Sequence, residues 1–187
     1  MKKIQAGLFF AGILSAGPAL AALSPGDPAP DFTLQAAVGG KEFIFSLAEA
    51  RKQGPVVVYF YPKSFTRGCT IEAHEFADAA ASFAEAKATL IGISADPIET
   101  QKDFSTKECR DKFPVAADPT LSVIRAFDVV RTNSGDAASA MSDRVSFVIS
   151  PDGRIIYAYS DRLPDKHIEN TLGVVRQWQE QHGALKP

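Results

Sequence analysis

Apolar residues occur in short runs separated by polar turns along most of the chain. Residues 56–61 and 89–94 are apolar at both alternating sets of positions and rich in β-branched or aromatic side chains. Such runs are typical of strands that helices cover on both faces of a sheet. Further strands are predicted for the shorter runs at 32–34, 43–45, 115–117, 144–150 and 154–160. The last two flank a Pro-Asp-Gly turn and should pair as a hairpin.

Helical periodicity follows the first long apolar run. The apolar positions between residues 68 and 86 fall on one stripe, formed by Ala73, Phe76, Ala80 and Phe83. This spacing predicts a helix packed on the sheet, with Glu72 and the other acidic residues on its outer faces. Residues 47–51 predict a helical turn, and the segment that begins at Asp165 predicts a last helix.

Aspartate–proline pairs mark the start of two more predicted helices. Asp96 is expected to cap a helix that has Pro97 at its first position and runs through Cys109. Asp118, also followed by proline, gives the same signal for a helix that extends through Phe127.

Strands and helices alternate through the middle of the chain. The order ββ, βαβα, βα and ββα favours an α/β fold, in which helices flank a mixed central sheet with an N-terminal β-hairpin. Residues 133–142 are small and polar, which predicts a surface loop.

The first 21 residues have the three parts of a secretory signal peptide. Lys2 and Lys3 precede a short apolar stretch, residues 4–14, and an Ala-x-Ala cleavage site ends at Ala21. We therefore expect residues 1–21 to be removed, the chain to be exported to the periplasm, and residues 22–187 to form one domain. A buried N-terminal helix is the alternative interpretation of this segment.

Charge argues against two kinds of partner. The chain holds 20 Lys and Arg against 22 Asp and Glu, a net charge of −2, and loss of Lys2 and Lys3 would make it −4. The basic residues do not cluster along the sequence. We therefore expect neither nucleic acid nor an anionic membrane as a partner.

The two cysteines, Cys69 and Cys109, carry the candidate chemistry. Cys69 follows a strand and a loop, and lies at the start of the helix predicted for residues 68–86. Unpaired backbone N–H groups and the helix dipole at such a position favour a thiolate over a thiol. Cys69 is therefore a candidate nucleophile. In an oxidising compartment the two cysteines could instead form a structural disulfide.

The residues around Cys69 resemble a known family. The spacing Pro-x-x-x-Thr-x-x-Cys, which ends at Cys69, resembles the active-site motif of peroxiredoxins. Residues 59–72 resemble the peroxiredoxin Q, or bacterioferritin comigratory protein, branch of the AhpC/TSA superfamily. Residues 29–34 and 144–153 resemble the opening and the late hairpin of that branch. The resemblance implies a thioredoxin-like fold and thiol-dependent reduction of hydrogen peroxide and organic hydroperoxides, without a cofactor or a metal ion.

The same resemblance implies a role for each residue near the motif. The Cys69 thiolate attacks the peroxide O–O bond and becomes a sulfenic acid. Thr66 and Arg144 position Cys69 and the peroxide oxygens, and Pro62 shields the site. Without the resemblance, Thr66 would be a helix N-cap, Arg144 a solvated charge, Pro62 a strand terminator and Glu72 a first-turn residue that favours the helix dipole.

His74 stands where the peroxiredoxin Q pattern most often has a second, resolving cysteine. By resemblance to members that carry this cysteine in the helix predicted after Asp96, Cys109 is the expected resolving residue. A Cys69–Cys109 disulfide would require the first helical turn around Cys69 to unwind. His74 is expected to be an exposed helical residue, because a metal site of Cys69 and His74 lacks further ligands.

Other functions stay open at this point. The chain could be a one-cysteine peroxidase that an external thiol recycles, or an exported domain with a structural Cys69–Cys109 bridge. A disulfide-exchange enzyme is less favoured, because the chain has no Cys-x-x-Cys motif. The expected electron donor is a thioredoxin-like or glutaredoxin-like protein of the periplasm, and the branch implies a monomer.

Overall fold

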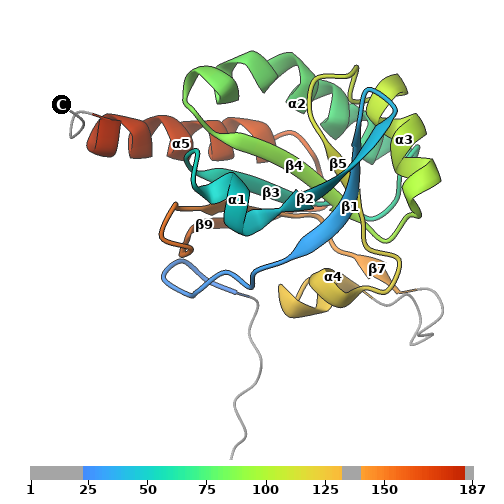
Figure 1. The fold of residues 1–187 in the computed structure, drawn as a ribbon, viewed down its shortest axis with the longest axis horizontal. Helices are drawn as coiled ribbons and strands as arrows, with labels where there is room; N and C mark the ends of the chain where they lie inside the picture. The colour runs from blue at the N-terminus through green and yellow to red at the C-terminus, as the bar shows by residue number, and fades with distance from the viewer. Residues whose placement is uncertain (1–22, 132–139, 184–187) are drawn as a thin grey trace, which may run out of the picture.

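One mixed sheet of seven strands runs through the centre of the molecule (Figure 1). The structure, a computed structural model, describes residues 23–131 and 140–183. The predicted signal peptide, residues 1–21, lies outside the described residues, as does most of the loop predicted at 133–142.

The predicted elements occur in the predicted order. The strands are β1 (Thr33–Val38), β2 (Lys41–Ser46), β3 (Val56–Phe60), β4 (Thr89–Ser94), β5 (Val115–Ala117), β6 (Val130–Arg131), β7 (Met141–Ser142), β8 (Val145–Ile149) and β9 (Ile155–Ser160). The helices are α1 (Leu47–Arg51), α2 (Arg67–Glu85), α3 (Ile98–Lys107), α4 (Ser122–Ala126) and α5 (His167–Gly183). Two short strands, β6 and β7, are added between the helix α4 and the strand β8. The sheet order is β2-β1-β5-β4-β3-β8-β9, with β3, β4 and β5 parallel and the hairpins β1–β2 and β8–β9 antiparallel. The predicted α/β class, with its mixed sheet and N-terminal hairpin, is confirmed.

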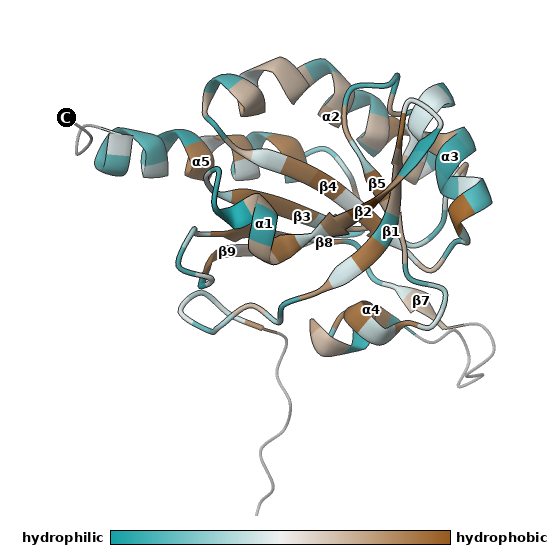
Figure 2. Cartoon of the chain, in the orientation of Figure 1, coloured by the Kyte–Doolittle hydropathy of each residue, from teal (hydrophilic) through white to brown (hydrophobic). Residues whose placement is uncertain are grey.

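Both faces of the central strand β3 are buried, as its apolar pattern predicts. Val56, Val58 and Phe60 belong to the core cluster that also contains residues of α1 and α4. Val57 and Tyr59 point to the opposite face, into the cluster formed with α2, α3 and α5. Figure 2 shows hydrophobic strands at the centre of the sheet and a mixture of hydrophilic and hydrophobic residues along the helices. No helix among the described residues is both long and apolar enough to cross a membrane.

The predicted cap of α3 is wrong. The helix begins at Ile98, and Asp96 does not cap it. The Asp96 carboxylate instead accepts hydrogen bonds from the Ser64 backbone N–H at 2.7 Å and from the Ser94 hydroxyl at 2.8 Å. Asp96 therefore ties the loop after β3 to the end of β4.

The helix predicted from Asp118 is shorter than expected. The Asp118 carboxylate does accept backbone N–H groups at the start of α4, including that of Ile124 at 2.9 Å. The helix begins only at Ser122, however, because Leu121 takes a left-handed conformation with φ of 59°. It also ends before Phe127.

Cys109 lies outside α3, contrary to the prediction. The helix ends at Lys107, and the N–H group of Cys109 closes the following turn by donating to the Phe104 carbonyl at 3.0 Å. Arg110 and Asp111 then take left-handed conformations, with φ of 52° and 58°. Because such a pair cannot continue a right-handed helix, Cys109 sits in a turn.

The loop predicted at 133–142 ends in a strand. Met141 and Ser142 form β7, which pairs with β6. Ser142 is buried, and its hydroxyl donates to the Tyr61 carbonyl at 2.6 Å. This bond fixes the chain before β8 to the end of β3, from which the loop that leads to Cys69 continues.

Gly92 leaves room for the ring of Tyr59. A Cβ atom at Gly92 would lie 2.6 Å from Cζ of Tyr59, which stacks on Phe76 at 4.4 Å. We expect Gly92→Ala to lower the free energy of unfolding by about 1–3 kcal/mol, because the ring must shift within a packed core. Urea denaturation measures the change.

Gly173 is the matched control for this substitution. It lies within α5, and a Cβ atom there would meet nothing within 4 Å. Gly173→Ala should therefore raise the free energy of unfolding by roughly 0.5–1 kcal/mol. Equal effects at the two glycines would contradict the close approach of Tyr59 to Gly92.

Candidate active site

A cavity of about 380 Å³ brings together four of the five predicted site residues. Pro62 and Thr66 come from the loop after β3, Cys69 from the first turn of α2, and Arg144 from the position just before β8. The remaining lining residues are Lys63, Arg131, Met141 and Arg162. Cys109, the fifth predicted residue, does not line this cavity.

Cys69 lies against a guanidinium group. Its side chain is free and only 2% exposed, and Arg144 Nη2 donates to its Sγ at 3.4 Å. Gly68 permits this contact, because a Cβ atom there would lie 3.1 Å from the same Nη2. The positive guanidinium and the N-terminus of α2 therefore both lie at one sulfur atom.

Thr66 begins α2 without capping it through its side chain. The residue holds the N-cap position, but its side chain makes no capping hydrogen bond. Its hydroxyl instead donates to the Lys63 carbonyl at 2.9 Å. Because the proton is committed there, the Thr66 oxygen is left as an acceptor beside Cys69. The alternative interpretation, in which the Thr66 side chain caps the helix, is therefore wrong.

Arg144 is a buried charge, not a solvated one. Its side chain is 6% exposed and donates through all three nitrogens: Nε to the Arg162 carbonyl at 3.0 Å, Nη1 to Glu72, and Nη2 to Cys69. These three partners fix the plane of the guanidinium beside the sulfur atom.

Glu72 corrects the predicted surface of α2. We expected it on an outer face, but it is fully buried and pairs with Arg144. Burial raises the pKa of Glu72 from 4.5 to about 8, although the Arg144 guanidinium opposes the shift. The spacing along α2 could have indicated this burial. Glu72 lies three residues after Cys69 and four before Phe76, on the face that packs against the sheet.

His167 forms a second buried layer behind the ion pair, and no sequence motif pointed to it. It is the first residue of α5, which begins two residues after the predicted Asp165. Nε2 lies 3.1 Å from the Asp161 carbonyl, and Nδ1 lies 2.8 Å from the Ser146 hydroxyl. Nε2 must therefore donate, so Nδ1 accepts from Ser146. Burial lowers the pKa of His167 to about 4, and Nδ1 lies 3.9 Å from a Glu72 oxygen.

His74, on α2, contacts the turn that carries Cys109. His74, expected to be exposed, is 36% exposed, and its Nε2 lies 2.7 Å from a carboxylate oxygen of Glu108. Arg110 reaches back to Asp78 on the same helix at 2.7 Å. Cys109, between these two pairs, is fully buried and free, and burial raises its pKa. Within the described part of the chain, no three His, Cys, Asp or Glu residues gather as metal ligands would.

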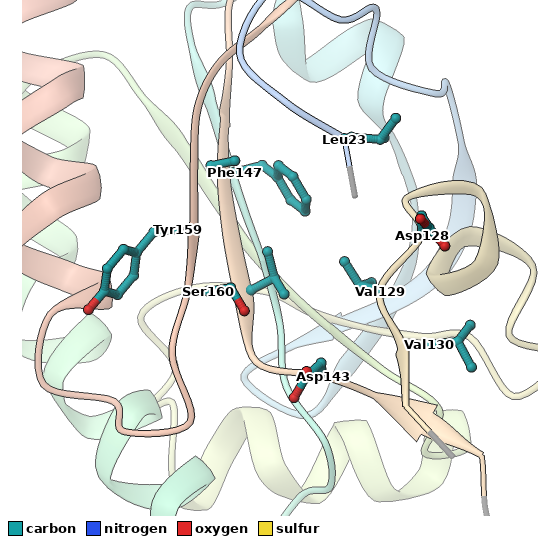
Figure 3. Close-up of a pocket in the computed structure, with 10 residues that line it drawn as sticks. Leu23, Asp128, Val129, Val130, Asp143, Phe147, Tyr159 and Ser160 are labelled. Carbon is teal, nitrogen blue, oxygen red and sulfur yellow. The ribbon is translucent and has the colours of Figure 1, made fainter. Parts of the chain in front are cut away.

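Figure 3 shows a second cavity, of about 200 Å³. Its lining is mainly apolar, with Val129 and Phe147 among the residues that Figure 3 labels, and its carboxylates are those of Asp128 and Asp143. It contains neither cysteine nor histidine. The predicted nucleophile, Cys69, therefore lines the cavity that also contains Pro62, Thr66 and Arg144, and it does not line this one.

Comparisons with known proteins agree with this site. Residues 25–158 match the model of the AhpC/TSA family. A peroxiredoxin Q of rice chloroplasts is 34% identical over 155 residues, which span 82% of this chain and 67% of that protein. The crystal structure of peroxidoxin BcpB from Mycobacterium tuberculosis aligns with a TM-score of 0.74 at 33% identity, over 83% of this chain and 97% of that one.

A peroxiredoxin Q structure from Xylella fastidiosa also aligns with a TM-score of 0.74, at 25% identity over 84% of this chain and 98% of that one. These likenesses confirm the thioredoxin-like fold that the sequence predicts. The chain therefore belongs to the AhpC/TSA family and is a peroxiredoxin, a thiol peroxidase, of the peroxiredoxin Q and Bcp branch.

Proposed function

We propose that Cys69 reduces hydrogen peroxide and organic hydroperoxides. The Cys69 thiolate attacks one peroxide oxygen, the O–O bond breaks, and the sulfur becomes a sulfenic acid. The leaving oxygen takes a proton and departs as water or an alcohol. The contact between Arg144 Nη2 and Cys69 Sγ is the observation that carries this proposal, because it places a fixed positive donor where negative charge develops.

Thr66 and Arg144 would orient the peroxide between them. The Thr66 oxygen can accept the peroxide O–H, because its own proton goes to the Lys63 carbonyl. Arg144 can only donate, and so binds the oxygen that leaves. This division of donor and acceptor points one oxygen of the peroxide at the Cys69 sulfur.

We further propose that Cys109 resolves the sulfenic acid. The Cys109 thiolate would attack the Cys69 sulfur, the S–O bond would break as the disulfide forms, and the leaving hydroxide would take up a proton and depart as water. Cys109 cannot do this in the folded state, because it is fully buried with a raised pKa and does not line the Cys69 cavity. The turn that carries it must leave α2, and the first turn of α2 must unwind. A periplasmic thioredoxin-like or glutaredoxin-like protein would then reduce the disulfide.

A single oxidation tests both steps. The reduced protein is mixed with one equivalent of hydrogen peroxide, alkylated and analysed by non-reducing mass spectrometry. We expect loss of both thiols and a Cys69–Cys109 disulfide in the wild type, and a Cys69 sulfenic acid in Cys109→Ser. Persistent sulfenic acid with free Cys109 in the wild type would favour the one-cysteine mechanism. Two intact thiols would contradict the peroxidase itself.

Export and a monomeric state are part of the same proposal. They rest on the signal-like residues 1–21 and on the family resemblance. A structural bridge is the competing function for the cysteine pair, and the free thiols of the structure do not favour it. Resistance of an isolated disulfide to dithiothreitol would support that bridge.

A further inference from the structure

Among the residues that the structure describes, the cavity around Cys69 is lined by four basic side chains and by no acidic one. Lys63, Arg131, Arg144 and Arg162 line it, and its other described lining residues are Pro62, Thr66, Cys69 and Met141. The whole chain has a net charge of −2, so this concentration of positive charge is local. Clefts lined by one sign of charge attract ligands of the opposite sign.

Two of these four charges have no acidic partner. Arg144 is paired with Glu72, and Arg131 lies 3.5 Å from a carboxylate oxygen of Asp143. Lys63 and Arg162 are exposed, and neither has a carboxylate within 4.0 Å in the described part of the chain. The mouth of the cavity therefore presents two uncompensated cations.

The main chain of both residues is fixed beside the reacting sulfur. The Lys63 carbonyl accepts the Thr66 hydroxyl, and the Arg162 carbonyl accepts Arg144 Nε. The Lys63 and Arg162 side chains therefore line the cavity beside Thr66 and Arg144. Lys63 precedes Cys69 in the sequence, and Arg162 follows Arg144.

The cavity is also larger than hydrogen peroxide requires. It measures about 380 Å³, whereas one water molecule occupies roughly 30 Å³ of the liquid. Pro62 and Met141 supply apolar surface on its walls. Space, apolar contact and uncompensated positive charge together fit an organic anion.

We propose that this site prefers organic hydroperoxides that carry a carboxylate, held by Lys63 and Arg162. The proposal rests on the peroxidase function of Cys69 and names its substrate class. One peroxide oxygen passes to the Cys69 sulfur, the O–O bond breaks, and the alcohol leaves with its carboxylate unchanged.

A matched pair of substrates tests the preference. The probes are cumene hydroperoxide with a para carboxylate and the neutral methyl ester of the same compound. Rapid quenching and mass spectrometry give the rate constant for Cys69 oxidation by each. We expect a roughly 5-fold preference for the carboxylate at low salt, which shrinks as ionic strength rises.

Variants assign the preference to the mouth of the cavity. In Lys63→Gln/Arg162→Gln the ratio of the two rate constants should fall close to one. Arg176→Gln removes the charge of an exposed arginine that does not line the cavity, and should keep the wild-type ratio.

The possible outcomes distinguish the substrate preference from the peroxidase activity of Cys69. Failure of hydrogen peroxide to oxidise Cys69 would overturn the peroxidase. Oxidation by hydrogen peroxide with equal rates for carboxylate and ester would overturn only the substrate preference. A preference that survives in the double variant would also overturn it. The preference would also be overturned if the double variant were slowed only in its reduction by an acidic protein donor. Lys63 and Arg162 would then bind that donor rather than the peroxide.

Discussion

Replacing Cys69 with serine should lower the rate of peroxide consumption by about 10⁴-fold or more, which is the scale on which loss of a nucleophile acts in enzymes. A serine hydroxyl fits the buried position and can still accept from Arg144 Nη2, so the fold should persist. A coupled peroxidase assay measures the rate, and circular dichroism checks the fold.

Cys109→Ser is the matched control, because it alters the other buried cysteine. It should still form the sulfenic acid at the wild-type order of magnitude, although it cannot form the disulfide. Peroxide consumption that persists in Cys69→Ser would contradict the assignment of the nucleophile. So would a Cys109→Ser variant that, like Cys69→Ser, forms no sulfenic acid.

Replacing Arg144 with methionine should lower the rate constant for Cys69 oxidation by about 10²–10³-fold at pH 7, the usual effect of removing one preorganised donor.

The free energy of unfolding should also change in this variant, and the change should depend on pH. The folded pKa of Glu72 is raised, so the folded state holds a proton that the unfolded state releases, and stability falls as pH rises from 4.5 towards 8.

Without the guanidinium, the pKa of Glu72 should rise further, and this loss should continue above pH 8. We therefore expect Arg144→Met to lose roughly 1 kcal/mol of stability relative to the wild type for each pH unit above 8. Urea denaturation at pH 7, 8 and 9 measures the trend.

The double variant Arg144→Met/Glu72→Gln separates the two effects. Removing the titrating carboxyl should abolish the additional loss of stability at high pH, whereas the oxidation rate should stay low. Recovery of the rate in the double variant would mean that Arg144 acts on folding alone and not on the reacting oxygens.

Local pattern carried most of the fold. The strands β4 and β5 have the predicted bounds because each is a clear apolar run, and the helix α1, which directly follows β2, also has its predicted bounds. The end of α3 could not be predicted, since Arg110 and Asp111 take left-handed conformations without glycine or proline to signal them. Cys109 was misplaced for that reason.

The residues of the sequence motif could be predicted, whereas the buried residues behind them could not. Cys69, Thr66 and Arg144 meet as the family resemblance implies. Glu72 and His167 were missed, because a charged or titratable residue on a helix is usually solvated. Their burial depends on a partner far along the chain, Arg144 for Glu72, and local sequence does not reveal such a partner.

The hydrogen bonds from Thr66 to the Lys63 carbonyl and from Arg144 to the Arg162 carbonyl have an evolutionary consequence. Both use main-chain atoms, which every amino acid supplies. The side chains at positions 63 and 162 can therefore change without releasing the groups that orient the peroxide. Mutations there can retune which substrates enter, while the reaction itself is inherited unaltered.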